Sequence, residues 1–337
     1  MSASAEWRQR PPPVEPIPLV GCSALWTGAV QLAERYAPTK LPILLVGATG
    51  TGKEVLAQHI HRLSRRTGDL VDVNCGAIPR EMTEGLLFGH RRGAFTGAFD
   101  DSTGLVAQAA GGTLFLDELS SMCVEGQAKL LRVLDTGELR RLGDHVKQRV
   151  DFRVIGAVQD DVELLVERGL LRADLYHRVG SVVIHLPRLH ERAQDLNPLA
   201  THFAELHGLT VTDDALALLR THEWPGNVRE LRAVVDRAAV LTDGQRILAC
   251  HLAEALHGFN PTHGLAGGSL AQEREARHSL LHLCEKYEGD GEAIARAVGV
   301  SRATLYRRLK AAGIRLTAMK GRDPAPSHSS QDSPETP

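Results

Sequence analysis

Aromatic residues and long apolar runs are both scarce in this sequence. Only 4% of the 337 residues are aromatic, so the cores must be built from Leu, Val, Ile and Ala. A membrane-spanning helix needs about 20 consecutive apolar residues, and no stretch of the chain provides them. Residues 1–18 are polar and proline-rich rather than a signal peptide. These absences predict a cytoplasmic protein without a membrane partner.

Disulfide and metal-binding patterns are also missing. The five cysteines are odd in number and form no C-x-x-C pair, and the sixteen histidines form no H-E-x-x-H pattern. We therefore expect reduced thiols, and histidines that serve surface and packing roles. The cysteines are Cys22, Cys75, Cys123, Cys250 and Cys284.

A glycine-rich segment is the most informative motif in the first half of the chain. It follows an apolar run at 43–46 and precedes a helical pattern at 55–63, and it comprises Gly47, Ala48, Thr49, Gly50, Thr51, Gly52, Lys53 and Glu54. Such a loop turns successive N–H groups toward a phosphate, and its lysine adds a positive charge. The alternative is an ordinary Gly/Thr turn, but the strand and helix on either side favour a loop that binds a nucleoside triphosphate. Because Glu54 replaces the Ser or Thr that binds Mg²⁺ in other phosphate loops, the metal needs another carboxylate.

Polar residues end two further apolar segments. Residues 113–116 are followed by Asp117 and Glu118, which could hold Mg²⁺ and orient the attacking water. Paired acids are also common as solvated strand ends, but together with a phosphate loop they indicate hydrolysis. Asn74 ends the segment at 70–73, where open parallel sheets place functional groups.

The last third of the chain changes in composition. From residue 195 to about 256 the apolar spacing is helical, residues 261–269 read as a linker, and a helix, helix, glycine turn, helix pattern follows. Between residues 296 and 322 there are eight Arg or Lys residues and no Asp or Glu. A basic helix alone is more often just solvated, but after a glycine turn it favours DNA contact. Ser301 would cap that helix, and the candidate contacts are Arg302, Thr304, Tyr306, Arg307, Arg308 and Lys310.

Residues 93–98 read GAFTGA, which resembles the signature of the sigma-54-dependent transcriptional activators of the AAA+ class. Other segments resemble the same family in order: GTGKE at 50–54, GGTLFLDE at 111–118, LRADLYHR at 171–178 and WPGNVREL at 224–231. The end of the chain resembles the family's Fis-type DNA-binding domain. The resemblance covers residues 19 to about 316.

This resemblance implies an α/β fold: a AAA+ P-loop ATPase with a parallel sheet flanked by helices, an α-helical lid and a C-terminal all-α helix-turn-helix. The short lead-in leaves no length for a sensor domain upstream. The implied divisions are a disordered lead-in at 1–18, the α/β subdomain at 19–188, the lid at 189–258, a linker at 259–270, the helix-turn-helix at 271–318 and a disordered tail at 319–337.

Residue roles follow from the same resemblance. Lys53 would grip the phosphates of ATP, Asp117 would bind Mg²⁺, and Glu118 would polarise the water. Asn74 matches a switch residue that holds the catalytic glutamate, and Arg229 matches a lid arginine that senses the nucleotide. Arg172 and Arg178 match arginine fingers that reach into the neighbouring subunit, so the resemblance implies a homo-oligomeric ring, a hexamer. Val20 and Gly21 are candidate contacts to the adenine base, with simple packing as the alternative.

The implied partners are sigma-54 with RNA polymerase, and double-stranded DNA at upstream activator sites. The sigma-54 contact would come from Gly93, Ala94, Phe95, Thr96, Gly97 and Ala98. For Phe95 a role as a core anchor is the alternative. ATP hydrolysis would move this loop and remodel the polymerase closed complex.

Several positions depart from the family pattern. Val158 and Gln159 replace the usual Thr-Asn of the first sensor, Leu171 replaces Phe, and Arg91-Arg92 replace a pair that usually begins with an acid. The sensor change leaves a second hypothesis open, a DNA-binding regulator with little or no ATP turnover. A third is an ATPase that remodels another DNA-bound complex, which GAFTGA disfavours. For Arg141 the sequence does not decide between a functional role and a surface ion pair.

Overall fold

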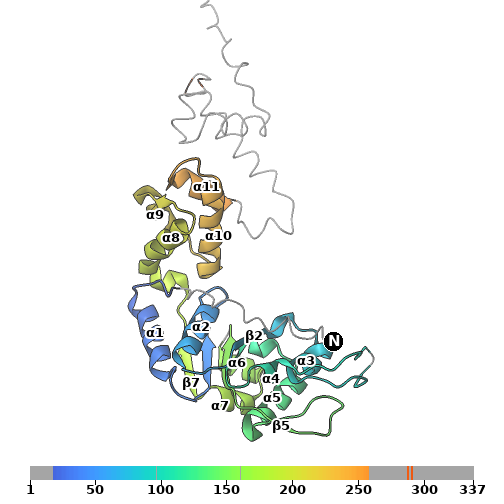
Figure 1. Ribbon diagram of the computed structural model, residues 1–337. Coiled ribbons are helices and arrows are strands. Elements are labelled where there is room, and N and C mark those ends of the chain that lie inside the picture. The colour runs from blue at the N-terminus through green and yellow to red at the C-terminus, as the bar shows by residue number, and fades with distance from the viewer. Residues whose placement is uncertain (1–17, 96, 160, 258–286, 288–289, 291–337) are drawn as a thin grey trace, which may run out of the picture. The chain divides into compact units, whose positions relative to one another are not determined.

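The computed structural model describes residues 18–257 apart from 96 and 160, together with residues 287 and 290 (Figure 1). The chain divides into two units, Met1–Ile247 and Leu248–Pro337. Within the second unit, the described element is helix α11 (Ala249–His257). The predicted helix-turn-helix lies outside the described residues, and so do its candidate DNA contacts Ser301, Arg302, Thr304, Tyr306, Arg307, Arg308 and Lys310.

A five-stranded parallel sheet forms the centre of the first unit, in the order β2-β3-β6-β1-β7. Alternate residues of its strands enter two separate cores: Leu44 and Val46 pack on one face, and Ile43 and Leu45 on the other. A sheet buried on both faces explains why these strands read as continuous apolar runs. The strands are β1 (Ile43–Val46), β2 (Leu70–Asn74), β3 (Thr113–Asp117), β6 (Arg153–Val158) and β7 (Val182–His185).

Helices cover both faces of the sheet, which confirms the predicted α/β class. One core is completed by α1 (Ala24–Tyr36) and α2 (Lys53–Leu63), and the other by helices α3 to α7 (Figure 1). The latter are α3 (Arg80–Phe88), α4 (Leu105–Gln108), α5 (Val124–Thr136), α6 (Val162–Glu167) and α7 (Ala173–Val179), and two short 3-10 helices, η2 (Cys75–Ala77) and η3 (Leu119–Ser121), follow β2 and β3.

Two loops extend from this subdomain. We call residues 90–102, between α3 and α4, the first loop; it contains the GAFTGA segment. The second loop, residues 140–147, joins the two strands of a short antiparallel hairpin, β4 (Glu138–Leu139) and β5 (Gln148–Arg149).

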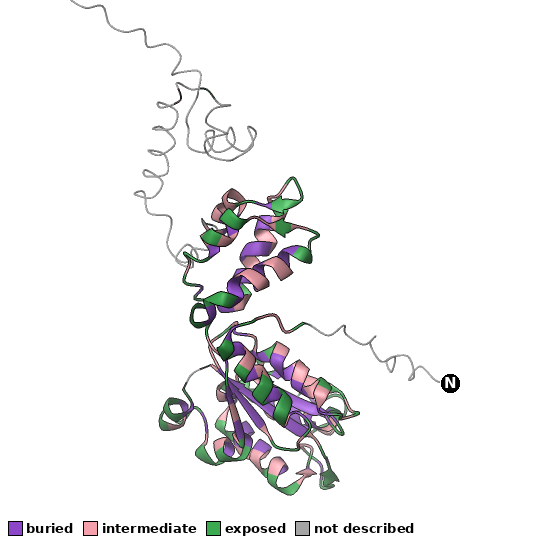
Figure 2. Ribbon diagram, turned by 90° about the vertical axis from the view of Figure 1, so that its left-hand side faces the viewer, coloured by how far each residue is buried: buried purple, intermediate pink, exposed green. Residues whose placement is uncertain are grey.

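The segment after the sheet is helical, as its apolar spacing predicts. The positions expected to face inward, such as Leu199, Phe203 and Val234, are buried, and buried stripes run along these helices in Figure 2. The elements are η4 (Leu189–Asp195), α8 (Leu196–Glu205), β8 (Thr210–Val211), α9 (Asp213–Leu219), α10 (Asn227–Val240) and β9 (Arg246–Ile247). Among the described residues, no helix is long and apolar enough to cross a membrane.

Candidate active site

A cavity of about 330 Å³ lies where the carboxyl ends of β1, β2, β3 and β6 meet the helical segment. This is the edge at which open parallel sheets bind ligands. The structure brings most of the predicted nucleotide residues to its wall, namely Val20, Thr49, Gly50, Thr51, Gly52, Lys53, Glu54, Asn74, Asp117, Glu118 and Arg229. Three others, Gly21, Gly47 and Ala48, are not among the lining residues.

The glycine-rich segment forms a loop that leads directly into α2. Gly50 and Gly52 have φ angles of 77° and 108°, a region that residues with a Cβ adopt only under strain. A Cβ on Gly50 would also lie 2.4 Å from the carbonyl oxygen of Gly226. Because α2 starts at Lys53, the unpaired N–H groups of its first turn lie at the pocket wall, as an anion site requires.

Lys53 is buried at the base of this loop. Its Nζ donates hydrogen bonds to the carbonyl oxygens of Gly47, at 2.7 Å, and Ala48, at 3.1 Å. Burial lowers the pKa of Lys53, and the nearby Asp117 carboxylate partly opposes that shift. The ammonium group is therefore held between the loop and the acidic end of β3.

The two acids predicted for catalysis lie at the end of β3. Asp117 Oδ1 accepts a hydrogen bond from the N–H of Glu118 at 3.0 Å. Glu118 itself has a left-handed φ of 52°, which costs a residue with a Cβ about 1–2 kcal/mol. Such strain is typical of functional sites, where surrounding contacts hold it in place.

Glu118 is held by Gln159 rather than by Asn74. Gln159 Nε2 donates to Glu118 Oε1 at 2.5 Å, and Gln159 Oε1 accepts from the hydroxyl of Thr49 at 2.8 Å. Asn74 Oδ1 instead accepts from the N–H groups of Gly76, at 2.9 Å, and Ala77, at 3.1 Å. Within the described residues, no hydrogen bond joins Asn74 to Glu118, so its predicted switch role stays a prediction.

The helical segment is hydrogen-bonded to the phosphate loop. The N–H of Val228 donates to the Gly50 carbonyl at 2.9 Å, and Asn227 Nδ2 donates to the Thr49 carbonyl at 3.0 Å. The buried guanidinium of Arg192 donates to the Thr51 carbonyl at 2.7 Å. A shift of the helical segment would therefore move the phosphate loop through these contacts.

Sequence reasoning missed Asn227, Arg192 and Trp26 as parts of this site. Asn227 has a left-handed φ of 52° and is buried; its place in the Trp-Pro-Gly-Asn turn was the available signal. The guanidinium of Arg192 stacks 4.5 Å from the ring centre of Trp26, which lines the cavity. The signal for Trp26 was its rarity, since the chain has only three tryptophans.

Arg172 and Arg178, the predicted arginine fingers, are absent from the cavity lining. Arg172 forms a bidentate pair with Asp174, with contacts of 3.0 and 2.7 Å. Arg178 donates to Asp135 at 2.9 Å and to the Leu134 carbonyl at 2.6 Å. Both are surface pairs, which are individually weak and readily exchanged. Neither guanidinium reaches the chain's own pocket, and their finger role stays a prediction.

Cys75 follows Asn74 and is buried, which disfavours its thiolate form. Burial, together with the carboxylates of Asp117 and Glu118, raises the pKa of its thiol to about 12. The described cysteines Cys22, Cys75, Cys123 and Cys250 are free thiols, as the sequence predicts.

The GAFTGA segment forms the tip of the first loop. Phe95 is 48% exposed and Phe99 80% exposed, so neither is a core anchor. The ring of Phe95 meets His90 edge to face, with 4.9 Å between ring centres. Gly93 and Gly97 have φ angles of 80° and 102°, which a glycine adopts freely. The loop thus presents the exposed rings of Phe95 and, just after the segment, Phe99.

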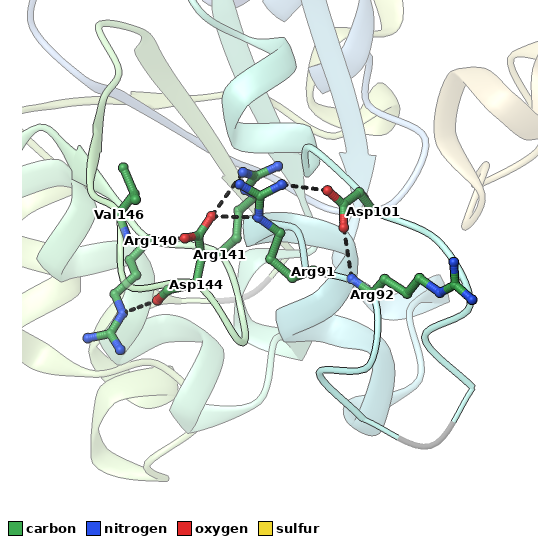
Figure 3. Close-up of polar contacts among 7 residues, drawn as sticks. All are labelled: Arg91, Arg92, Asp101, Arg140, Arg141, Asp144 and Val146. Atoms are coloured by element: carbon green, nitrogen blue, oxygen red, sulfur yellow. Dashed lines mark hydrogen bonds and ion pairs between the residues drawn. The ribbon is translucent and has the colours of Figure 1, made fainter.

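The two loops are joined at their bases (Figure 3). Arg91 lies between Asp101 of its own loop and Asp144 of the second loop, with Nη1–Oδ2 and Nε–Oδ2 distances of 2.5 and 2.9 Å. Arg141 contacts the same Asp144 oxygen at 2.9 Å. Backbone bonds add to this link, since Arg91 N–H donates to the Leu142 carbonyl at 2.9 Å.

This network explains two positions that the sequence left open. Arg91, where the family usually has an acid, pairs with acids on both loops, and Arg141 forms part of the same cluster. The N–H of Val146, with the guanidinium groups of Arg91 and Arg141, lowers the pKa of Asp144 to about 2. The Asp144 carboxylate therefore stays ionised down to acidic pH. Salt, rather than a change of pH in the physiological range, weakens its ion pairs.

Breaking the link should loosen both loops together. In Asp144→Asn we expect amide exchange at Arg91 and Leu142 to become about 10-fold faster, because the charged bridge that joins the two loops is lost. Hydrogen exchange followed by mass spectrometry measures this. Lys147→Ala, which removes an exposed pair within the hairpin, is the control and should leave residues 90–102 unchanged. Faster exchange in the second loop alone would contradict the link.

The sheet, the phosphate loop, the paired acids and the helical segment after the sheet together define the AAA+ P-loop fold. The family described as "Sigma-54 interaction domain" matches residues 19–185, and "AAA+ ATPase lid domain" matches residues 190–266. This chain belongs to the sigma-54-dependent transcriptional activator family.

Relatives of the chain support this assignment. It is 43% identical over 251 residues to the DNA-binding transcriptional regulator NtrC of Rhizobium meliloti, covering 71% of this chain and 52% of NtrC. It is 38% identical over 330 residues to the nitric oxide reductase transcription regulator NorR1 of Cupriavidus necator, covering 88% of this chain and 63% of NorR1. The chain thus spans between half and two thirds of the length of these relatives.

Solved structures agree on the fold. The crystal structure of NtrX from Brucella abortus in complex with ATP is 32% identical, with a TM-score of 0.65, covering 88% of this chain and 70% of that one. A RuvB mutant from Thermotoga maritima has a TM-score of 0.51 at 19% identity, covering 88% of this chain and 89% of that one, and shows the fold alone.

Proposed function

We propose that this protein hydrolyses ATP and uses the energy to activate transcription that depends on sigma-54. The observation that carries the proposal is the convergence of the phosphate loop, Lys53, Asp117 and Glu118 on one cavity. The loop and Lys53 bind the phosphates, and Glu118 orients the attacking water. The cavity volume of about 330 Å³ suits a bound cofactor.

The donor chemistry of the site fits Mg²⁺. Among the described residues, no three His, Cys, Asp or Glu side chains are grouped as a metal site. Mg²⁺ is commonly bound through one or two carboxylates plus substrate phosphates and water, and Asp117 supplies such a carboxylate beside the phosphate loop. The ion would neutralise charge on the phosphate oxygens.

We infer that the active site is shared between subunits of a homo-oligomeric ring, a hexamer. Arg172, the residue that precedes α7, and Arg178, an exposed residue of α7, lie outside the lining of their own pocket. A guanidinium donated by a neighbour stabilises charge on the transferring phosphoryl group. Arg229, on the lid side of the pocket, senses the nucleotide within the subunit, and Val20 contacts the base.

The first loop is the proposed contact to sigma-54 and RNA polymerase. Its exposed Phe95 and Phe99 give an apolar tip, and the links to the second loop let the two loops move as one body. The contact comprises Gly93, Ala94, Phe95, Thr96, Gly97 and Ala98, of which Thr96 lies outside the described residues. The C-terminal segment binds double-stranded DNA at upstream sites, by its resemblance to a Fis-type domain.

Capture on immobilised sigma-54 tests the proposed partner. With ADP and aluminium fluoride, which mimic the transferring phosphoryl group, we expect the protein to be retained, and with ADP alone we expect it to pass through. Phe95→Ala should weaken capture at least about 10-fold, since buried aromatic anchors dominate interfaces. Val146→Ala, an exposed apolar residue of the second loop, is the matched control. Equal capture with and without the analogue would contradict the proposal.

A further inference from the structure

Gln159 occupies a position from which one side chain can reach both halves of the candidate site. It follows β6, which lies between β3 and β1 in the sheet. The carboxyl end of β3 carries Glu118, and the carboxyl end of β1 leads into the phosphate loop. A side chain at the end of the strand between them is therefore flanked by the catalytic acid on one side and by the loop on the other.

The carboxamide of Gln159 contacts both neighbours at once. Its Nε2 donates to Glu118 Oε1 at 2.5 Å, and its Oε1 accepts from the Thr49 hydroxyl at 2.8 Å. The bond to a carboxylate is charge-assisted and so stronger than a neutral hydrogen bond. The other oxygen of Glu118 lies over Gly76, where a Cβ would come within 2.3 Å of it. Glu118 is thus confined between Gly76 and the Gln159 amide.

The length of the side chain is essential to this bridge. Asparagine would place the same carboxamide about 1.5 Å closer to the backbone, one C–C bond shorter. Starting from contacts of 2.5 and 2.8 Å, it could not keep both. Val158, the other departure at the sensor, is fully buried in the core beneath the sheet. Val158 does not line the cavity, so the loss of the threonine hydroxyl at this position does not alter the cavity wall. The change at the wall comes from Gln159.

We propose that Gln159 is the positioning residue of this site: it holds Glu118 against the phosphate loop through Thr49, taking the role that the resemblance assigns to Asn74. This inference rests on the proposed ATPase activity. It assigns to one amide the orientation of the acid relative to the phosphate loop.

Steady-state ATP hydrolysis by the full chain tests the proposal. Gln159→Glu keeps the length but places a carboxylate against Glu118, and Gln159→Asn keeps the chemistry but shortens the reach. We expect both to lower kcat by about 10- to 100-fold, the loss of one hydrogen bond to a charged group. KM for ATP should stay within about threefold. Gln108→Asn, on an exposed position of α4, should behave as the wild type.

A double-mutant cycle separates positioning from a structural role. In a Glu118→Gln background, measured by single-turnover hydrolysis, Gln159→Asn should cause less than about a twofold further loss, because its target is already gone. Asn74→Ala in the wild-type background should cost less than Gln159→Asn. The proposal is overturned if Gln159→Asn lowers hydrolysis by the same factor with and without Glu118, or if its effect is on KM alone.

The controls distinguish this inference from the proposed function itself. If the wild type and Gln108→Asn hydrolyse no ATP, the ATPase proposal fails. If they hydrolyse ATP, Glu118→Gln abolishes turnover, and the Gln159 variants match the wild type, then the ATPase stands and the role of Gln159 is wrong. Thermal unfolding of each variant, expected within a few degrees of the wild type, shows that the fold is retained.

Discussion

Glu118→Gln should lower the rate of ATP hydrolysis by about 10²–10³-fold while nucleotide binding stays within a few fold. The amide keeps the size of the side chain and can still contact Gln159, but it cannot accept a proton from water. Lys53 donates its hydrogen bonds to the carbonyl oxygens of Gly47 and Ala48 rather than to Glu118, so the change leaves these contacts in place. Phosphate release measures the rate, and a fluorescent ATP analogue measures binding.

The matched control for this change is Glu163→Gln. Glu163 is an exposed acid on α6 that does not line the cavity, so its neutralisation should leave kcat unchanged. If Glu118→Gln hydrolysed ATP at the wild-type rate, the water-orienting role would be wrong. If it lost ATP binding as well, the change would have disturbed the loop rather than the chemistry.

Arg178→Ala should lower the rate of ATP hydrolysis by about 10³-fold at every protein concentration. The change removes an exposed ion pair with Asp135, which contributes little to stability. A large kinetic loss with an unchanged unfolding temperature would therefore place the guanidinium at the reacting phosphate of a neighbour. The comparison is Arg168→Ala, an exposed arginine at the C-terminal end of α6, which should retain activity.

Local patterns were sufficient to predict the core of the site. The phosphate loop could be predicted because strand, glycines, lysine and helix follow one another within 21 residues, from Ile43 to Leu63. The acids after β3 were predicted for the same reason. Each signal lies within one strand and its following turn, and the parallel sheet brings these ends together at one edge.

The contacts that tune the site could not be predicted in this way. The bridge between Thr49 and Gln159 joins residues 110 apart, and Asn227 reaches Thr49 across 178. Both depend on strand order and on where the lid lies, which no local pattern encodes. Gln159 was recognised as a departure that could impair the sensor, whereas the structure shows it hydrogen-bonded to the acid itself.

A mixture of two inactive variants tests most directly whether the active site is shared between subunits. Lys53→Ala lacks the phosphate-binding amine but keeps Arg178, and Arg178→Ala lacks the finger but keeps its own pocket. In randomly mixed rings about a quarter of the sites combine an intact pocket with an intact neighbouring finger. The account predicts ATP hydrolysis near a quarter of the wild-type rate from the mixture, and none from either variant alone. A mixture as inactive as its components, although it assembles as the wild type does, would contradict the account.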